Sequence, residues 1–305
     1  MRKPSSIYYA AGIISAMFLW ATSFPFVIWG LKEVPPLTLA FLRYFILIPV
    51  LVLYMHLDTG LEKAIHSLKT DWRALLLLSL TTVTLPNIFQ NLGMERNQSS
   101  SISSILQSSG PLFTVILAMM ILKERMEWYQ WIGLGIGLFG SILLATDGLA
   151  VFSGGTFEGN TLVMLSAISY AFATIIGKQL LHRNEPSSVV SWSNIIGALF
   201  LYPPALMEGC PIPMSTSAWM NILGLALFSS FLAYVIWYKL MKYMTVSKLI
   251  ITVYLIPVIT VGLSYWWLGE ILTLNQICFA TLIIAGVVIA QYSVRGSEGS
   301  EHTVK

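Results

Sequence analysis

The sequence predicts an all-α polytopic membrane protein with ten transmembrane helices, arranged as two five-helix halves of opposite orientation. Three observations support this fold class. Of the 305 residues, 56% are hydrophobic and only 10% are charged, whereas a soluble domain carries about 25% charged residues. The charged residues gather in short links between long apolar segments. Finally, residues of the first half recur in the second half at a nearly constant offset.

The apolar segments define the spans, each close to the roughly 20 residues that cross a bilayer core. In chain order we place them at Ala10–Gly30, Leu37–Leu57, Ala74–Met94, Ile102–Leu122, Trp128–Thr146, Asn160–Leu180, Val189–Met207, Ala218–Leu240, Leu249–Leu268 and Leu274–Val294. The first segment follows a basic start that resembles a signal peptide, but its apolar run up to Gly30 is too long for one.

The links between the spans are short, and they set the domain organisation. The longest, at 56–73, is predicted to hold a short interfacial helix. A link rich in glycine, serine and threonine then joins the two halves. We therefore divide the chain into a first repeat, an outer linker, a second repeat and a cytoplasmic tail, at 8–147, 148–159, 160–294 and 295–305.

Lysine and arginine gather on one side of these spans, which the positive-inside rule assigns to the cytoplasm. Of the 17 lysines and arginines, only Lys32 and Arg96 fall in links on the opposite side, and Arg43 lies within a span. This bias predicts a multi-pass protein of the cell membrane with both termini in the cytoplasm.

The second half repeats the first at an offset of 150 residues near the start of each half, and of 146 near its end. Trp20 thus corresponds to Tyr170, and Pro36 to Pro186. Near the end of the halves, the residues identical to their counterparts are Pro111, Thr114, Val115, Leu117, Leu122, Glu124, Gln130 and Gly140. Because each half has an odd number of spans, the second enters the membrane from the opposite side, which is typical of secondary transporters.

Two long segments, SSGPLFTVILAMMILKERMEWYQWIGLGIGLFGSILL and YLIPVITVGLSYWWLGEILTLNQICFATLIIAGVVIA, resemble the closing helices of the EamA repeat of the drug/metabolite transporter superfamily. The segments WATSFPFVIWG and PPLTLAFLRYF resemble its first two helices. The resemblance covers almost all of 8–294, and it implies two inverted repeats around a central cavity that moves small metabolites, often amino acids and often outward. One departure is Lys123–Glu124, where the family usually has the glycine-glutamate seen at Gly269–Glu270.

Polar side chains within the spans are the candidates for binding a substrate, because burying them in a membrane is costly. In the first half, the third and fourth spans carry a face of amides and hydroxyls, with the members Thr84, Asn87, Gln90, Asn91, Gln107 and Ser108. Such a face suits a zwitterion or a polar ring. The alternative is that these groups only form hydrogen bonds between helices.

The corresponding positions of the second half are aromatic. Ile88 and Asn91 correspond to Tyr234 and Trp237, and Tyr254 corresponds to Ser108. Further candidates for the cavity wall are Trp20, Tyr170 and Asn194. We therefore expect a pocket for a small, mostly uncharged or zwitterionic metabolite with an apolar part, while core packing is the alternative for the aromatic residues.

Prolines and glycines within the spans predict breaks and close contacts. The candidate hinges and helix breaks are Pro25, Pro86, Pro111 and Pro257; Pro86 removes a backbone hydrogen bond and frees a carbonyl nearby. The fifth span has a stripe of small residues at Gly133, Gly137 and Ser141. We expect this stripe to pack within its own half, with a dimer interface as the alternative.

Arg43 interrupts an apolar stretch about 10 Å below the outer end of the second span. Its counterpart is Ser193, so the charge belongs to one half only. Three roles are open: a pair with Glu33 or another outer acid as part of a gate, attraction of a substrate carboxylate in the cavity, or snorkelling to the lipid headgroups.

These features favour a metabolite transporter whose partners are a small-molecule substrate and the lipid bilayer, as a monomer or homodimer. All fourteen acidic residues and all four histidines lie in links, tails or helix ends, so no proton relay at depth is predicted. The spans hold no paired carboxylates, nucleophile–base pair or metal-ligand cluster, so we predict neither an enzyme nor a cofactor. The net charge of +3 is too small to indicate nucleic acid. A channel or a structural membrane protein is the remaining alternative.

Overall fold

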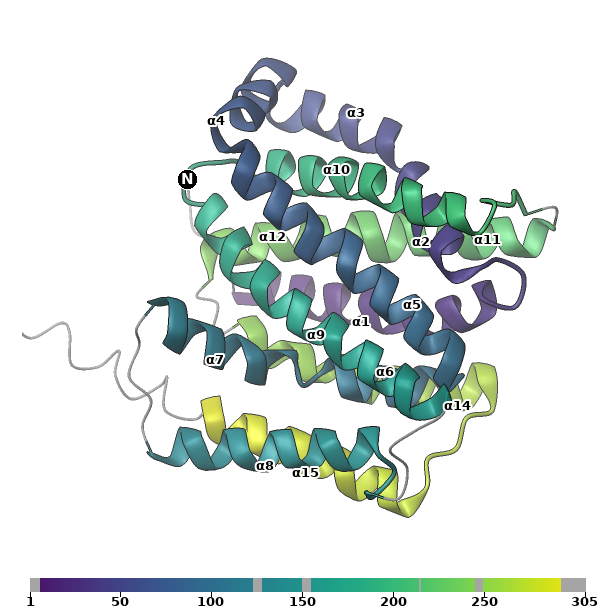
Figure 1. Cartoon of the computed structure of the whole chain (residues 1–305). Helices are drawn as coiled ribbons and strands as arrows, with labels where there is room; N and C mark the ends of the chain where they lie inside the picture. The colour runs from purple at the N-terminus through teal and green to yellow at the C-terminus, as the bar shows by residue number, and fades with distance from the viewer. Residues whose placement is uncertain (1–5, 123–127, 150–154, 214, 245–248, 292–305) are drawn as a thin grey trace, which may run out of the picture.

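The computed structural model describes residues 6–122, 128–149, 155–213, 215–244 and 249–291, and within these ranges it contains helices and no strand. Figure 1 shows the helices packed side by side along similar directions. In chain order they are α1 (Ser6–Gly30), α2 (Pro36–Phe45), α3 (Ile48–Asp58), α4 (Leu61–Ser79), η1 (Leu80–Thr84), α5 (Leu85–Asn97), α6 (Ser100–Gln107), α7 (Gly110–Leu122), α8 (Trp128–Ala145), α9 (Gly155–Leu180), α10 (Pro186–Met207), α11 (Thr216–Gly224), η2 (Leu225–Leu232), α12 (Ala233–Tyr243), η3 (Ile251–Tyr254), α14 (Leu255–Leu268) and α15 (Leu274–Gln291).

Several of these helices are long and apolar enough to cross a membrane. Among the described residues there are 6 such candidates, at Tyr9–Gly30, Pro36–Asp58, Leu61–Asn97, Thr156–Leu180, Pro186–Met207 and Thr216–Tyr243. Shorter apolar helices occupy Trp131–Ala145, Thr252–Leu268 and Leu274–Gly286. The all-helical membrane fold is therefore confirmed in its general form.

Some predicted spans consist of two helices placed end to end. The second breaks between α2 and α3, just before Pro49, because a proline lacks the N–H and its ring clashes with the preceding turn. The predicted interfacial helix in the link 56–73 is not separate. It forms the first part of α4, which continues into the third span through a kink at Asp71 (φ −114°, ψ 24°).

The helix contacts follow the repeat. The third span of each half packs on the first span of the other half, as α5 on α9 and α12 on α1. In the same way α6 and α7 pack on α9, while α14 packs on α1. Two further pairs, α2 with α10 and α8 with α15, each join equivalent elements of the two halves. Exchanging the halves therefore reproduces the packing pattern, as expected for a two-fold pseudosymmetric bundle.

The small-residue stripe of α8 packs within its own half and also against the other half: a Cβ added at Gly137 would lie 2.6 Å from Leu112 of α7. A Cβ added at Gly286 of α15 would lie 2.6 Å from the Gly133 carbonyl oxygen and 2.5 Å from the Gly137 Cα. The two helix backbones therefore touch directly, and only glycine permits this approach. The stripe is buried by α15 in the monomer, as Figure 1 shows for the two adjacent helices.

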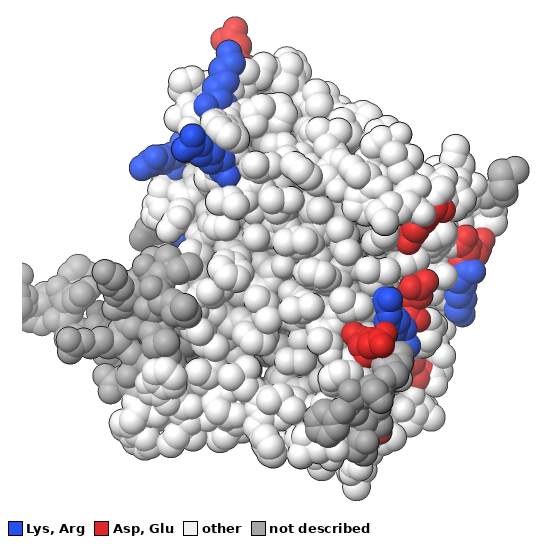
Figure 2. Space-filling model, in the orientation of Figure 1, with Lys and Arg blue, Asp and Glu red and all other residues white. Residues whose placement is uncertain are grey.

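Charged residues lie at two opposite edges of the molecule, with an uncharged band between them on the face shown in Figure 2. Lysine and arginine predominate near the start of α4, and acidic residues at the opposite edge. We call the acidic edge, where α6 begins and α14 ends, the Glu270 end, and the edge where α3 ends and α10 begins the Asp58 end.

Two carboxylates bind helix N-termini across the halves at the Glu270 end. Glu208, which follows α10, accepts hydrogen bonds from the backbone N–H of Leu37 (3.1 Å) and from the N–H (2.7 Å) and hydroxyl (2.9 Å) of Thr38. Glu270 likewise accepts from the N–H groups of Ser100 (2.8 Å) and Ser101 (2.9 Å). An anion is favoured at a helix N-terminus because it meets unpaired N–H groups and the positive end of the dipole. We call these two contacts the carboxylate clamps.

Candidate functional site

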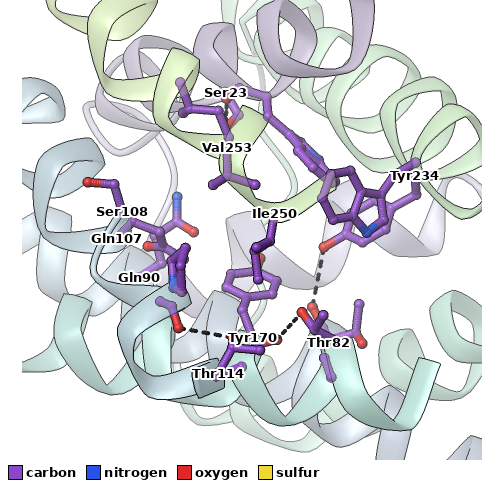
Figure 3. Close-up of a pocket in the computed structure, with 18 of the residues that line it drawn as sticks. Ser23, Thr82, Gln90, Gln107, Ser108, Thr114, Tyr170, Tyr234, Ile250 and Val253 are labelled. Carbon is purple, nitrogen blue, oxygen red and sulfur yellow. Dashed lines mark hydrogen bonds between the residues drawn. The ribbon is translucent and has the colours of Figure 1, made fainter. Parts of the chain in front are cut away.

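A cavity of about 140 Å³ lies between the two halves, and residues of both halves form its wall (Figure 3). The structure places eight of the predicted site residues on this wall: Trp20, Arg43, Gln90, Gln107, Ser108, Tyr170, Tyr234 and Trp237. Figure 3 shows Gln90, Gln107 and Ser108 on one side of the cavity and Tyr234 on the other. The cavity thus has an amide side from the first half and an aromatic side largely from the second.

The aromatic side is a set of rings in contact with one another. The Trp20 ring centroid lies 5.5 Å from that of Tyr234, nearly perpendicular to it at 79°. It lies 5.0 Å from the Trp237 centroid, and the rings of Tyr234 and Tyr238 stack at 6.4 Å. Edge-to-face and offset contacts of this kind stabilise the rings in fixed positions. They form a rigid apolar surface that suits an apolar or planar ligand group.

Arg43 is 5% exposed and lies on the cavity wall. Its Nε donates to the Ser230 hydroxyl, and its Nη1 donates to Asn87 Oδ1 at 3.3 Å. Of the three roles left open by the sequence, snorkelling does not fit this burial. A pair with Glu33 does not form either, since that carboxylate accepts from the Ser215 hydroxyl instead.

The helices beside Arg43 contain matched π-helical segments. The first, η1, spans Leu80–Thr84, and the second, η2, spans Leu225–Leu232 and includes the positions 146 residues later. Such widened turns leave backbone groups less regularly paired and occur often at functional sites. They place Thr82 on the cavity wall and Ser230 against Arg43.

The carbonyls four residues before two of the candidate hinges, Pro86 and Pro25, accept hydrogen bonds from side chains. Pro86 cannot donate to the Thr82 carbonyl, which instead accepts from the Tyr234 hydroxyl at 3.4 Å. Pro25 lies within α1, and the carbonyl four residues before it, that of Ala21, accepts from the Thr260 hydroxyl at 3.2 Å. Both bonds join the two halves.

The other two prolines follow helix interruptions. Pro111 comes shortly after the break between α6 and α7, and Pro257 shortly after the change from η3 to α14. These interruptions occupy matched positions in the two repeats, and the residues around both line the cavity. Motion at these hinge candidates stays a prediction.

Five predicted site residues do not line the cavity. The amides and hydroxyl of the third span hold neighbouring helices instead: Thr84 donates to the Gly197 carbonyl (3.3 Å), and Asn91 to the Pro36 carbonyl (3.0 Å). Asn87 does not line the cavity itself but accepts a hydrogen bond from Arg43, which does. The remaining two are Asn194, which donates to the carbonyl one turn earlier in α10, and Tyr254, which packs in a small apolar cluster.

Several wall residues escaped the sequence analysis, among them Thr82, Ser23, Tyr238 and Met241. Tyr238 and Met241 follow Tyr234 at positions i+4 and i+7, so the helical period alone could have found them. Thr82 could not be found in this way, because its orientation depends on the π-helical turn that contains it.

Among the described residues of the wall there is no Asp, Glu, His or Lys, and Arg43 carries the one formal charge. No group of three or more His, Cys, Asp or Glu residues close enough to hold a metal ion occurs among the described residues. The chemistry that this wall offers is therefore recognition by hydrogen bonds, aromatic contact and one positive charge.

Comparison with known proteins gives matches over most of the chain. The chain is 28% identical over 276 residues to a protein of Archaeoglobus fulgidus named an uncharacterized transporter, covering 90% of this chain and 93% of that protein. It is 26% identical over 290 residues to a Salmonella typhimurium protein named a probable amino-acid metabolite efflux pump, covering 91% and 92%. A probable terminal-alkyne amino-acid exporter of Streptantibioticus cattleyicolor is 29% identical over 194 residues, covering 61% and 62%.

The fold also has a counterpart among solved structures. A crystal structure superimposes with a TM-score of 0.69 over 96% of this chain and 100% of the other, at 17% sequence identity, which supports the fold alone. The model of the EamA-like transporter family matches the sequence twice, at residues 7–146 and 157–292. These two matches cover both halves of the helix bundle, and they show that the chain belongs to the EamA-like transporter family.

Proposed function

We propose that this protein is a secondary transporter that exports small metabolites, amino acids or related compounds, by alternating access of its two repeats. The cavity between the halves carries this proposal, because both halves supply its wall and the carboxylate clamps join them at one end. A site at the repeat interface is where inverted-repeat transporters bind their substrates. The names of two relatives, an amino-acid metabolite efflux pump and an amino-acid exporter, favour the substrate class and the outward direction.

The proposed topology has ten spans in two inverted repeats, with both termini in the cytoplasm and the Glu270 end outside the cell. The excess of lysine and arginine in the links and tails at the other end supports this orientation. The cavity wall includes Met241, Ile250 and Val253, which lie toward the Asp58 end, whereas the clamps hold the Glu270 end together. At the Asp58 end the halves are joined by hydroxyl and amide contacts instead, between Thr59 and Ser187 and between Asn184 and Asp71.

The alternative is a facilitator or exchanger that couples to no ion. It is favoured by the composition of the described cavity wall, which has no carboxylate or imidazole to carry a proton. A proton-coupled transporter usually places such a group at depth.

Counterflow in proteoliposomes tests the function. Vesicles loaded with unlabelled amino acids are diluted into a trace of one labelled amino acid, with protein-free vesicles as the control. A transporter accumulates the label transiently, because exchange is faster than net loss. Equilibration without accumulation would indicate a channel, and no flux of any amino acid would contradict the proposed substrate class. A pH gradient that leaves the rates unchanged would favour the uncoupled alternative.

A further inference from the structure

Arg43 is a buried cation without a carboxylate partner in the described part of the protein. The ion pairs there are Arg96 with Glu158, and Lys242 with Glu185. Both involve partly exposed side chains away from the cavity. Removing a charge from water costs several kcal/mol unless an opposite charge or a full set of hydrogen bonds compensates it. The protein therefore retains this cation at a cost that calls for a functional reason.

The partners of Arg43 are neutral, and they leave part of the guanidinium free. Its two hydrogen bonds go to the Ser230 hydroxyl and to Asn87 Oδ1. A guanidinium has five N–H donors, so three make no hydrogen bond to the described residues, although the Tyr44 ring centroid lies 5.3 Å from the guanidinium carbon. Planar donors of this kind match the two oxygens of a carboxylate, to which arginine binds in a bidentate manner.

The position of this guanidinium is fixed in advance by both halves. Asn87 donates to the Tyr44 hydroxyl at 3.0 Å and to the Val83 carbonyl at 2.7 Å, which orients its Oδ1 toward Arg43. Ser230 holds the other edge from η2 in the second half. A donor held in place in this way loses little freedom when an anion binds, and the binding energy rises accordingly.

We propose that Arg43 binds a carboxylate of the transported molecule, and that the carboxylate is required for recognition while an amino group is not. The described wall offers no acid to pair with an ammonium group, only neutral acceptors such as Gln107 Oε1, which is buried and has no partner. The ring surface of Trp20, Tyr234 and Trp237 contacts an apolar part of the ligand. This inference rests on the proposed function, since it identifies the ligand of the same cavity.

The charge balance favours a monocarboxylate over a phosphate ester. One carboxylate neutralises one guanidinium, so the occupied cavity has no net charge from this pair. A phosphate dianion would leave a net negative charge buried beside the rings, which is disfavoured in a medium of low dielectric constant.

Binding to the purified full-length protein tests the proposal with matched pairs of probes. Each pair joins an acid to its amide: phenylacetate with phenylacetamide, and leucine with leucinamide. We expect both acids to bind at least about tenfold more tightly than their amides, and phenylacetate to bind although it has no amino group. Equal affinities within the pairs, or binding of neither acid, would overturn the proposal without any variant.

Substitutions then assign the effect to Arg43. In Arg43→Gln the preference for acids over amides should vanish, and in Arg43→Lys it should persist at lower affinity, because the charge remains but the planar fork is lost. Arg96→Gln is the matched control, since Arg96 lies outside the cavity and pairs with Glu158. A preference for acids that is unchanged in folded Arg43→Gln would also overturn the proposal.

Counterflow separates this inference from the proposed function. If no tested compound is exchanged, the transport function itself fails. If compounds are exchanged but acids and amides are exchanged equally well, transport stands and the role of Arg43 is wrong.

Discussion

At the scale of single residues, the two halves use matched positions in different ways. Thr114 and Thr260 are identical counterparts, yet Thr114 donates to the Gly110 carbonyl in its own helix (3.1 Å), while Thr260 donates across the halves to the Ala21 carbonyl. The difference follows from Pro25, which leaves that carbonyl without its helical donor; position 175 in the second repeat is an isoleucine. One proline therefore turns a local hydrogen bond into a contact between the repeats.

We expect Thr260→Ala to lower the stability of the protein by about 1–3 kcal/mol, because a buried carbonyl loses its partner. Thr114→Ala is the control and should cost less, since the Gly110 carbonyl lies within a regular helix. Thermal unfolding in detergent measures both. Equal losses of stability in the two variants would mean that the hydrogen bond between Thr260 and the Ala21 carbonyl adds no more stability than a hydrogen bond within one helix.

Glu270 gives a prediction about pH. Burial acts to raise the pKa of this carboxyl, but hydrogen bonds donated by Ser101 and Ser100 outweigh it and lower the pKa below the ordinary value of 4.5. The folded protein thus binds this proton less readily than the unfolded chain. The stability that Glu270 contributes is present above about pH 4.5 and is lost as the pH falls through the lower folded pKa.

We therefore expect Glu270→Gln to be less stable than the parent protein at neutral pH, and the difference to shrink as the solution is acidified. Glu95→Gln, at an exposed carboxyl of α5, is the control and should leave the pH dependence unchanged. Unfolding curves at several pH values measure the effect. A stability difference that does not vary with pH would contradict a charged clamp.

At the scale of elements, the contact between α8 and α15 depends on the absence of side chains. We expect Gly286→Ala to destabilise the protein strongly, since the added Cβ meets the backbone of Gly137 and Gly133, which has no rotamer to change. Gly135→Ala in α8 is the control: nothing lies within 4 Å of its Cβ, and alanine favours a helix by about 1 kcal/mol over glycine. The unfolding temperature should fall for the first and stay level or rise for the second.

The elements also show what the sequence could predict. Hydropathy located the apolar helices and the offsets revealed the repeat, because both depend on patterns that extend over many residues. The break before Pro49 and the π-helical turns were not predicted, although the interruptions before Pro111 and Pro257 lie at predicted hinge candidates. The π-helical turn limited the site prediction as well. The sequence analysis assigns Thr84, Asn87, Gln90 and Asn91 to the cavity, but of these four only Gln90 lies on its wall, because η1 rotates the helix that follows it.

At the scale of the whole molecule, the repeat supplies a second set of clamp residues. Glu208 corresponds to Asp58 at the 150 offset, and Thr38 corresponds to Ser188. In this structure Asp58 is exposed, and the Ser188 hydroxyl is buried without a hydrogen-bond partner. The counterpart of Glu270 is Glu124, which lies outside the described residues. The clamp between Glu208 and Thr38 is therefore formed at the Glu270 end, whereas its counterpart between Asp58 and Ser188 is not formed at the Asp58 end.

We expect Asp58→Asn to leave the stability of this state nearly unchanged, because Asp58 makes no clamp here, but to slow exchange in counterflow if Asp58 binds the start of α10 when the Glu270 end opens. Glu62→Gln, at an exposed carboxyl near the same end, is the control. Exchange at the parental rate in Asp58→Asn would show that the second clamp does not form during transport.

The carboxylate clamps also bear on the relative populations of the two conformations that the proposed alternating access requires. Hydrogen bonds to a charged group contribute about 1.5–3 kcal/mol each, so separating Glu208 and Glu270 from their helices would by itself leave the opened shape almost unpopulated. A carrier that cycles needs two shapes within a few kcal/mol of one another. If the proposed alternating access holds, we expect Asp58 and the unpartnered Ser188 hydroxyl to form an equivalent contact in the other conformation and so keep the two conformations close in free energy.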